Sequence, residues 1–313
     1  MSEISKNLQC IDFHTHIYPQ NGFRNHISDH QTEKIKSAFK YYSLFTHAIQ
    51  QKIHIIPDTI RKNIDPLLLA FTLPPITVNS TAIDLEIELQ NNNVDFAIVA
   101  AHPPVITNQH ILLETDKNKK LIPCLSLDFA DAELFTVSNL KNPKFILKIN
   151  PMAMDLFLND EKVIEILELW NENSWPLVIH TGALHSSFFK HPEAGQIESL
   201  LTMVEKYKSI DFILLHMNIF KPYEALEFCQ KFENTKVTTS WQSEELITVA
   251  CKKLGSERVV FSSDWPLVGN NIEIRKNMIQ KMLQNNHLTT SEAENILYLN
   301  AKKILENYFS KKL

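Results

Sequence analysis

Short apolar runs alternate with amphipathic stretches along most of this chain, and this alternation restricts its fold more than any other feature. The runs 96–100 and 177–180 are rich in Val, Ile and Leu, as buried strands of parallel sheets are. Residues 161–172, by contrast, carry apolar side chains at helical spacing. The predicted strands are 11–16, 96–100, 122–127, 145–149, 177–180, 212–215, 236–239 and 258–262.

Eight strands that alternate with helices imply an α/β protein with parallel strands joined by helical crossovers. That number of units predicts a (β/α)8 TIM barrel, and we expect residues 1–313 to form one barrel domain. A doubly wound open sheet is the alternative, because periodicity alone does not show that a sheet closes. Polar residues at the strand ends, described below, favour the barrel.

Residues 21–80 interrupt the alternation directly after the first predicted strand. They contain an amphipathic stretch around Ile35 and Phe39 and end near Pro74 and Pro75, so we expect a mainly helical insertion. An insertion at this point of a barrel would lie over its mouth. We therefore interpret it as a lid or a wall of the substrate pocket, with a packing or interface element as an equal alternative.

The composition excludes several classes of protein. A formal net charge of −5 and a pI near 6.2 give no general attraction to nucleic acid or to an anionic membrane, and no apolar run approaches the length of a membrane span. The four cysteines are widely spaced, as in buried thiols of a reducing compartment, and the first ten residues do not form a secretory signal. We therefore expect a cytoplasmic protein.

The low glycine content excludes two nucleotide-binding motifs and one motif that carries a catalytic serine. Only five glycines occur in 313 residues, and no two lie close enough for a dinucleotide-binding fingerprint or a Walker loop. The G-x-S-x-G turn of serine hydrolases is absent as well.

Histidine and aspartate stand at the ends of several predicted strands. His14 and His16 end the first strand, where side chains two apart point to the same side. His180, His216 and Asp264 follow the apolar runs of the fifth, sixth and eighth strands. A single histidine of this kind is usually a hydrogen-bonded core residue. In a barrel, however, the carboxyl ends of all strands share one rim, so the five residues together indicate a metal site there.

Four stretches of the sequence resemble one known family. They are Ile11-Asp12-Phe13-His14-Thr15-His16, Val178-Ile179-His180-Thr181-Gly182, Leu214-Leu215-His216 and Val259-Val260-Phe261-Ser262-Ser263-Asp264-Trp265-Pro266. The chain is similar to the amidohydrolase superfamily of metal-dependent TIM-barrel enzymes. It resembles most the amidohydrolase-related branch, which includes aminocarboxymuconate-semialdehyde decarboxylase and lactone hydrolases. The final stretch Ile296–Ala301 resembles the closing helix of that branch.

The resemblance implies a role for each of these residues. His14, His16 and His180 match metal-binding histidines, Asp264 matches the aspartate beside the metal and the attacking water, and His216 matches the histidine that orients or deprotonates that water. Such a ligand set suits Zn²⁺ or another divalent ion, and we expect one ion per chain. A metal of this kind lowers the pKa of bound water to roughly 7. Asp264 could then carry the proton from the water to the leaving group.

Lys148 near the end of the fourth strand has more than one interpretation. In members with two metals a carboxylated lysine bridges the ions here, and His216 would then bind the second metal. We favour one metal and an unmodified lysine that holds a carboxylate or phosphate of the substrate. An ion pair with Asp128 or Asp155 is the third possibility.

Three further residues are candidates for substrate contact. His102 and His185 lie just beyond predicted strands, where the rim of the barrel is expected. Trp265 follows Asp264 directly, and its side chain either lines the pocket or packs in the core.

We expect a hydrolase that acts on a small-molecule ester, lactone or amide. Decarboxylation of a small unsaturated or aromatic acid is the first alternative, and a non-catalytic metal-binding barrel that serves a partner protein is the second. Decarboxylases usually hold the substrate carboxylate with arginine, and of the four arginines only Arg24 and Arg61 could face the mouth, together with Lys148. This scarcity favours hydrolysis. Relatives in this branch are often dimers, so a homodimer is possible.

Overall fold

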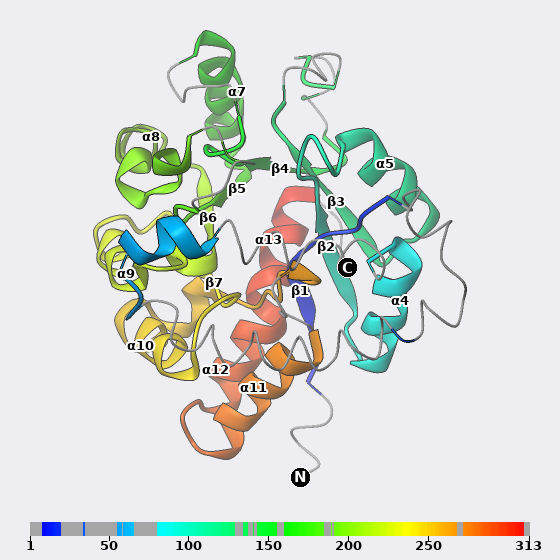
Figure 1. Ribbon diagram of the computed structural model, residues 1–313, viewed down its shortest axis with the longest axis vertical. Helices are drawn as coiled ribbons and strands as arrows, with labels where there is room; N and C mark the ends of the chain where they lie inside the picture. The colour runs from blue at the N-terminus through cyan, green and yellow to red at the C-terminus, as the bar shows by residue number, and fades with distance from the viewer. Residues whose placement is uncertain are drawn as a thin grey trace.

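The computed structural model describes residues 8–19, 34, 55–57, 59–65, 80–128, 134–136, 140, 143–154, 160–184, 189, 191–267 and 272–309. Within them, eight strands follow one another in chain order around a single sheet, and every neighbouring pair is parallel (Figure 1). The strands are β1 (Ile11–Thr15), β2 (Phe96–Ala100), β3 (Leu121–Ser126), β4 (Ile146–Ile149), β5 (Pro176–His180), β6 (Asp211–Leu215), β7 (Thr235–Thr238) and β8 (Val259–Val260).

The residues after β8 close the sheet against β1. Phe13 N donates to Phe261 O at 3.0 Å, Asp264 N donates to His14 O at 2.9 Å, and His16 N donates to Trp265 O at 2.7 Å. The predicted (β/α)8 barrel is therefore confirmed. The eighth strand is shorter than the predicted 258–262 because the chain leaves regular strand geometry at Phe261 while it continues to pair with β1.

Helices surround the barrel (Figure 1). Their bounds are α4 (Ala82–Asn91), α5 (Asn108–Lys117), α7 (Glu161–Glu172), α8 (Leu201–Lys206), α9 (Pro222–Lys231), α10 (Glu244–Leu254), α11 (Ile272–Gln284), α12 (Thr290–Glu294) and α13 (Asn300–Phe309). Just before α8 the chain forms 3₁₀ turns, in part because Ser199 Oγ donates to Ala194 O and Gln196 O. Between α12 and α13 the residues Asn295–Leu299 form a turn of π-helix.

The buried apolar residues form two main clusters. The outer cluster lies between the strands and the surrounding helices and contains, for example, Ala97, Val99 and Leu147. The inner cluster fills the barrel and contains Ile11, Phe13 and Ile146 together with residues of α13. Tyr308 of α13 donates its hydroxyl to Phe145 O at 2.6 Å, just before β4 begins. The helix α13 therefore covers the amino end of the barrel, opposite the rim on which the polar residues lie.

Only parts of the insertion 21–80 belong to the described residues. Residues 59–65 are helical, as expected for an insertion of this type, and Arg61 and Ile56 contact residues that follow β5 and β6. A lid function for the insertion stays a prediction. In the part of the chain that the structure describes, no helix has the length and apolar character needed to cross a membrane.

Candidate metal centre

A bulge in β1 orients the two histidines at its end. Asp12 pairs with Ala97 and Thr15 with Val99, so three steps along β1 match two along β2. One extra residue therefore lies between these pairs, and the alternation of faces shifts there. Asp12 and Thr15 pair with residues of the outer cluster, while Ile11 and Phe13 belong to the inner one. The bulge thus allows His14 and His16 to share the barrel interior although Asp12 faces away.

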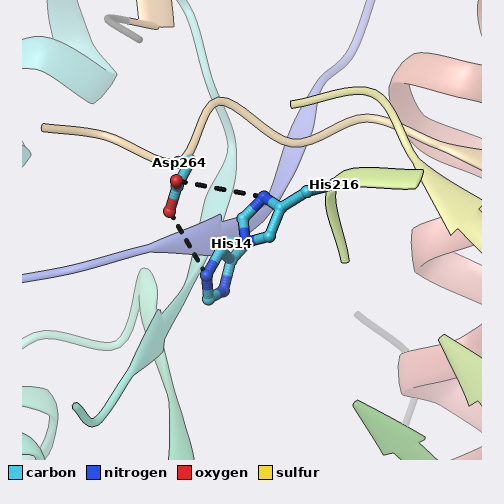
Figure 2. A group of neighbouring side chains, drawn as sticks. All are labelled: His14, His216 and Asp264. Atoms are coloured by element: carbon cyan, nitrogen blue, oxygen red, sulfur yellow. Dashed lines mark ion pairs between the residues drawn. The ribbon is translucent and has the colours of Figure 1, made fainter. Parts of the chain in front are cut away.

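The carboxylate of Asp264 faces three of the predicted histidines, and Figure 2 shows it with two of them, His14 and His216. Its Oδ1 is 3.3 Å from His14 Nε2 and 3.5 Å from His16 Nε2, and its Oδ2 is 3.9 Å from His216 Nδ1. Ligand atoms of His14, His216 and Asp264 all lie within 4.8 Å of one another. The ring centroid of His180 is 4.9 Å from that of His216. The structure therefore brings together all five residues chosen from the strand ends.

Hydrogen bonds fix the rings of two of these histidines. His16 Nδ1 lies 2.7 Å from the carbonyl oxygen of Ala100, an acceptor only, so Nδ1 carries the proton and Nε2 keeps its lone pair toward Asp264. His216 Nδ1 lies 2.8 Å from Ser240 Oγ. A hydrogen bond at one ring nitrogen typically holds a metal-binding histidine in one orientation, with its other nitrogen directed at the metal.

Several polar atoms of the centre are buried without a hydrogen-bond partner. Among the described residues this holds for His14 Nε2, His180 Nε2 and Asp264 Oδ1. Buried polar atoms are almost always hydrogen-bonded, so these nitrogen and oxygen atoms are available as ligands of a cation. Neutral imidazole nitrogens and one carboxylate oxygen are ligands that suit a divalent ion such as Zn²⁺. The residues therefore fit the predicted metal.

Burial keeps the imidazoles in the neutral form that binds metal. It lowers the pKa of His14, His16 and His216 well below the ordinary value, and that of His180 to about 3. The positive charge of Lys148 lowers each of these values further.

Asp264 has an environment suited to proton transfer. Burial raises the pKa of its carboxyl group to about 7, while a hydrogen bond from Trp241 and the charge of Lys148 act in the opposite direction. Trp241 Nε1 donates to Oδ2 at 2.6 Å. One carboxylate oxygen is thus held by the indole, and the other faces His14 and His16.

Lys148 lies on the inward face of β4. Ile146, two residues earlier, belongs to the inner cluster, whereas Leu147 and Ile149 belong to the outer one. Burial lowers the pKa of Lys148 to about 8, and the nearby Cys124 and Asp264 oppose this shift. Alternation extends the same face to Asn150, which is 2% exposed and whose amide nitrogen and oxygen lack hydrogen-bond partners in the described part of the chain. A cation and an unpaired amide therefore stand together at the carboxyl end of β4.

The other predicted contacts differ in position. The His102 ring lies 5.9 Å from that of His16 and 6.0 Å from that of Phe189, and burial lowers its pKa to about 4. The side chain of Trp265 belongs to the outer cluster, which favours the packing alternative, and its carbonyl oxygen accepts from His16 N. His185 and Asp155 lie outside the described residues.

The sequence reasoning missed Trp241, Ser240 and Asn150. All three lie within three residues of a strand end, but none is a histidine or a carboxylate, so the pattern that identified the metal-site candidates did not include them. Trp241, His216 and Asp264 also have φ angles of 70°, 63° and 59°, which bulky residues rarely adopt. Strained backbone of this kind tends to concentrate at functional sites.

Comparison with protein families gives a match over almost the whole chain. The family model described as Amidohydrolase matches residues 11–306. The comparison with curated proteins gives no match.

Solved structures of several proteins share the fold. An uncharacterised TIM-barrel protein from Bordetella bronchiseptica has a TM-score of 0.64 and 12% identity, with 96% of this chain and 99% of that chain covered. A 5-carboxyvanillate decarboxylase from Novosphingobium aromaticivorans, complexed with manganese, has a TM-score of 0.60 and 14% identity over 98% and 97% of the two chains. A putative 2-pyrone-4,6-dicarboxylic acid hydrolase from Pseudomonas putida has a TM-score of 0.54 and 16% identity over 73% and 88%.

Proposed function

This chain belongs to the Amidohydrolase family, and from that premise we propose that it is a metal-dependent hydrolase of a small-molecule ester, lactone or amide. The observation that carries the proposal is a group of buried atoms able to bind a metal. His14 Nε2 and His16 Nε2 face Asp264 Oδ1, and neither His14 Nε2 nor Asp264 Oδ1 has a hydrogen-bond partner among the described residues. In this proposal His14, His16, His180 and Asp264 hold one divalent ion. Such an ion supplies Lewis acidity toward a substrate carbonyl and toward water.

The remaining chemistry belongs to side chains of the centre. Asp264, whose Oδ2 accepts from Trp241 while Oδ1 faces His14 and His16, takes up a proton from the attacking water and returns it to the leaving atom. His216, oriented by Ser240, positions or deprotonates the same water. Lys148 and Asn150 bind an anionic or polar group of the substrate, since both face inward with little access to solvent. Contacts from His102 and His185 to the substrate are part of the same proposal.

Decarboxylation is the second candidate, and the buried cation of Lys148 is the observation in its favour. In that reaction Lys148 would bind the substrate carboxylate, a role that arginine usually has in decarboxylases. The three described arginines already make hydrogen bonds within the protein. Arg61 donates to Ala183 O, Arg258 to Thr235 O and Arg275 to Gln242 O, while Arg24 lies outside the described residues. Hydrolysis is therefore the function that we favour.

The test measures metal content first and activity second. We expect about one Zn²⁺ or Mn²⁺ per chain, and turnover of at least one lactone, ester or amide in a screen that also contains aromatic acids. Asp264→Asn should lower kcat by at least about 100-fold, because it removes the proton carrier. Release of CO₂ from an acid, without hydrolysis of any ester or amide, would establish the decarboxylase instead. Metal binding without turnover in a broad screen would favour the non-catalytic barrel.

A further inference from the structure

Trp241 links the metal centre to the surface of the barrel. It is 5% exposed, and its indole nitrogen donates to Asp264 Oδ2 at 2.6 Å. The other carboxylate oxygen, Oδ1, faces His14 Nε2 and His16 Nε2. Since a carboxylate can rotate about its bond to Cβ, the hydrogen bond from the indole fixes the plane of the carboxylate and therefore the direction in which its other oxygen faces the histidines.

On its other side Trp241 packs against a small apolar cluster, here termed the rim cluster. The rim cluster consists of Ile219, Phe220 and Trp241, with Ile56 and Leu184 packed against it. Ile56 belongs to the insertion, whereas Leu184 follows β5 and Ile219 and Phe220 follow β6. The rim cluster therefore joins the insertion to the loops that carry His180 and His216.

Arg61 fastens the insertion to this cluster. Its guanidinium carbon lies 2.9 Å from the centroid of the Phe220 ring. Its Nη2 donates to Ala183 O at 2.5 Å and to Asp65 Oδ2 at 3.1 Å, and the side chain is buried. Residues 59–65 are thereby held against the segments that follow β5 and β6, and Figure 1 shows this short blue helix beside β6 and α9.

We propose that Trp241 is a positioning residue for Asp264, and that residues 55–57 and 59–65 act on the metal centre through it. With these residues packed on the rim cluster, the indole N–H is directed at Oδ2, and Oδ1 is left for the ion. Release of these residues frees Trp241, so the carboxylate loses its fixed orientation. This inference rests on the proposed metal centre, and it makes the insertion a determinant of metal affinity as well as a neighbour of the pocket.

The first test is Trp241→Phe, which removes the N–H and keeps an aromatic ring in the rim cluster. Loss of a partner that orients a metal ligand typically weakens metal binding 10- to 100-fold, so we expect a dissociation constant for Zn²⁺ raised by about that factor. Competition with a chromogenic chelator measures it. The change in tryptophan fluorescence that Zn²⁺ causes in the wild type should also be lost. Trp170→Phe is the matched control, because its indole donates to Pro176 O at 3.1 Å at the amino end of the barrel.

The second test is Arg61→Met, alone and combined with Trp241→Phe. Alone it should weaken Zn²⁺ binding by about 2- to 20-fold. In the double variant it should add nothing, because the pathway through Trp241 is already broken. Additive effects would overturn the role of residues 55–57 and 59–65, and unchanged affinity in Trp241→Phe would overturn the role of the indole. A wild type that binds no metal would instead refute the proposed function itself.

Discussion

At the residue scale, Lys148 is a buried cation among neutral imidazoles, and its titration should appear in the stability of the metal-free protein. Its pKa is about 8 in the folded state and 10.5 ordinarily. Between these values the unfolded state binds more protons, so this residue makes the folded state more stable as pH rises from about 8 to 10.5. We therefore predict that wild type gains stability relative to Lys148→Met over this window.

The comparison with Lys148→Met removes an opposing effect. Burial raises the pKa of Cys10 and Cys251, so these two thiols lower stability at alkaline pH in both proteins. Urea unfolding with chelator present, at several values between pH 7.5 and 9.5, gives the difference between the two proteins. A difference that does not change with pH would mean that Lys148 titrates at its ordinary value.

The residue scale also shows what sequence reasoning could reach. His14, His16, His180, His216 and Asp264 were predictable because each polar residue interrupts or ends an apolar run, where a buried histidine or carboxylate needs a partner. Trp241 gave no such signal, since tryptophan after a strand is ordinarily a packing residue. Its role depends on an indole nitrogen 2.6 Å from Asp264, and this distance arises only from the left-handed backbone that follows β7.

At the scale of elements, the π-helical turn Asn295–Leu299 supports the segment that carries Asp264. Ile296 O accepts from Phe261 N at 2.9 Å, at the point where β8 ends. Asn300 then donates its amide to Ser256 O and Val259 O, both at 2.8 Å. Turns of π-helix free carbonyl groups from the helical ladder, and they are frequent near functional sites.

We predict that Asn300→Ala lowers the free energy of unfolding by about 1–3 kcal/mol, because two buried carbonyl groups lose their donor. Chemical denaturation measures the change. Asn295→Ala is the matched control, since Asn295 is only partly buried and donates to the Ser256 hydroxyl at 2.9 Å. It should cost clearly less. An equal decrease in the free energy of unfolding in the two variants would show that the hydrogen bonds of Asn300 contribute no more to stability than that of Asn295.

The bounds of helices and strands show where prediction from the sequence succeeded and where it failed. The helix predicted over 161–172 has those bounds in the structure, because its apolar face follows one regular period. The stretch Ile296–Ala301, which resembles a closing helix, lies largely in the π turn instead, and β8 has two regular residues. Both departures come from contacts between segments far apart in sequence, such as Phe261 with Ile296. The hydrophobic pattern of a short stretch carries no information about such contacts.

At the scale of the whole molecule, the metal centre lies across the seam at which the barrel closes. His14 and His16 belong to the β1 side, and Asp264 belongs to the segment after β8. The two sides are joined by backbone hydrogen bonds, and Asp12 Oδ1 also accepts from His14 N and Ser263 N. An ion that binds donors on both sides should therefore stabilise the closed barrel as a unit.

A ligand that binds only the folded state at 100 times its dissociation constant adds about 2.7 kcal/mol of stability. For a chain of this size we expect Tm to rise by about 5 °C or more when Zn²⁺ is added to chelated protein. His180→Ala and Asp264→Asn should lose this rise, because each removes a proposed ligand. His216→Asn should keep it while activity is lost, because we assign that residue to the attacking water.

Thr81→Ala separates this effect from general loss of stability. Thr81 caps α4 through a hydrogen bond from Asp84 N and is not among the proposed ligands, so its removal should lower stability by about 1 kcal/mol. The rise in Tm on metal addition should nevertheless be unchanged in this variant. If His216→Asn also lost the rise, His216 would be a ligand, as its Nδ1 at 3.9 Å from Asp264 Oδ2 permits. Retention of the rise together with loss of turnover is the result that assigns His216 to catalysis.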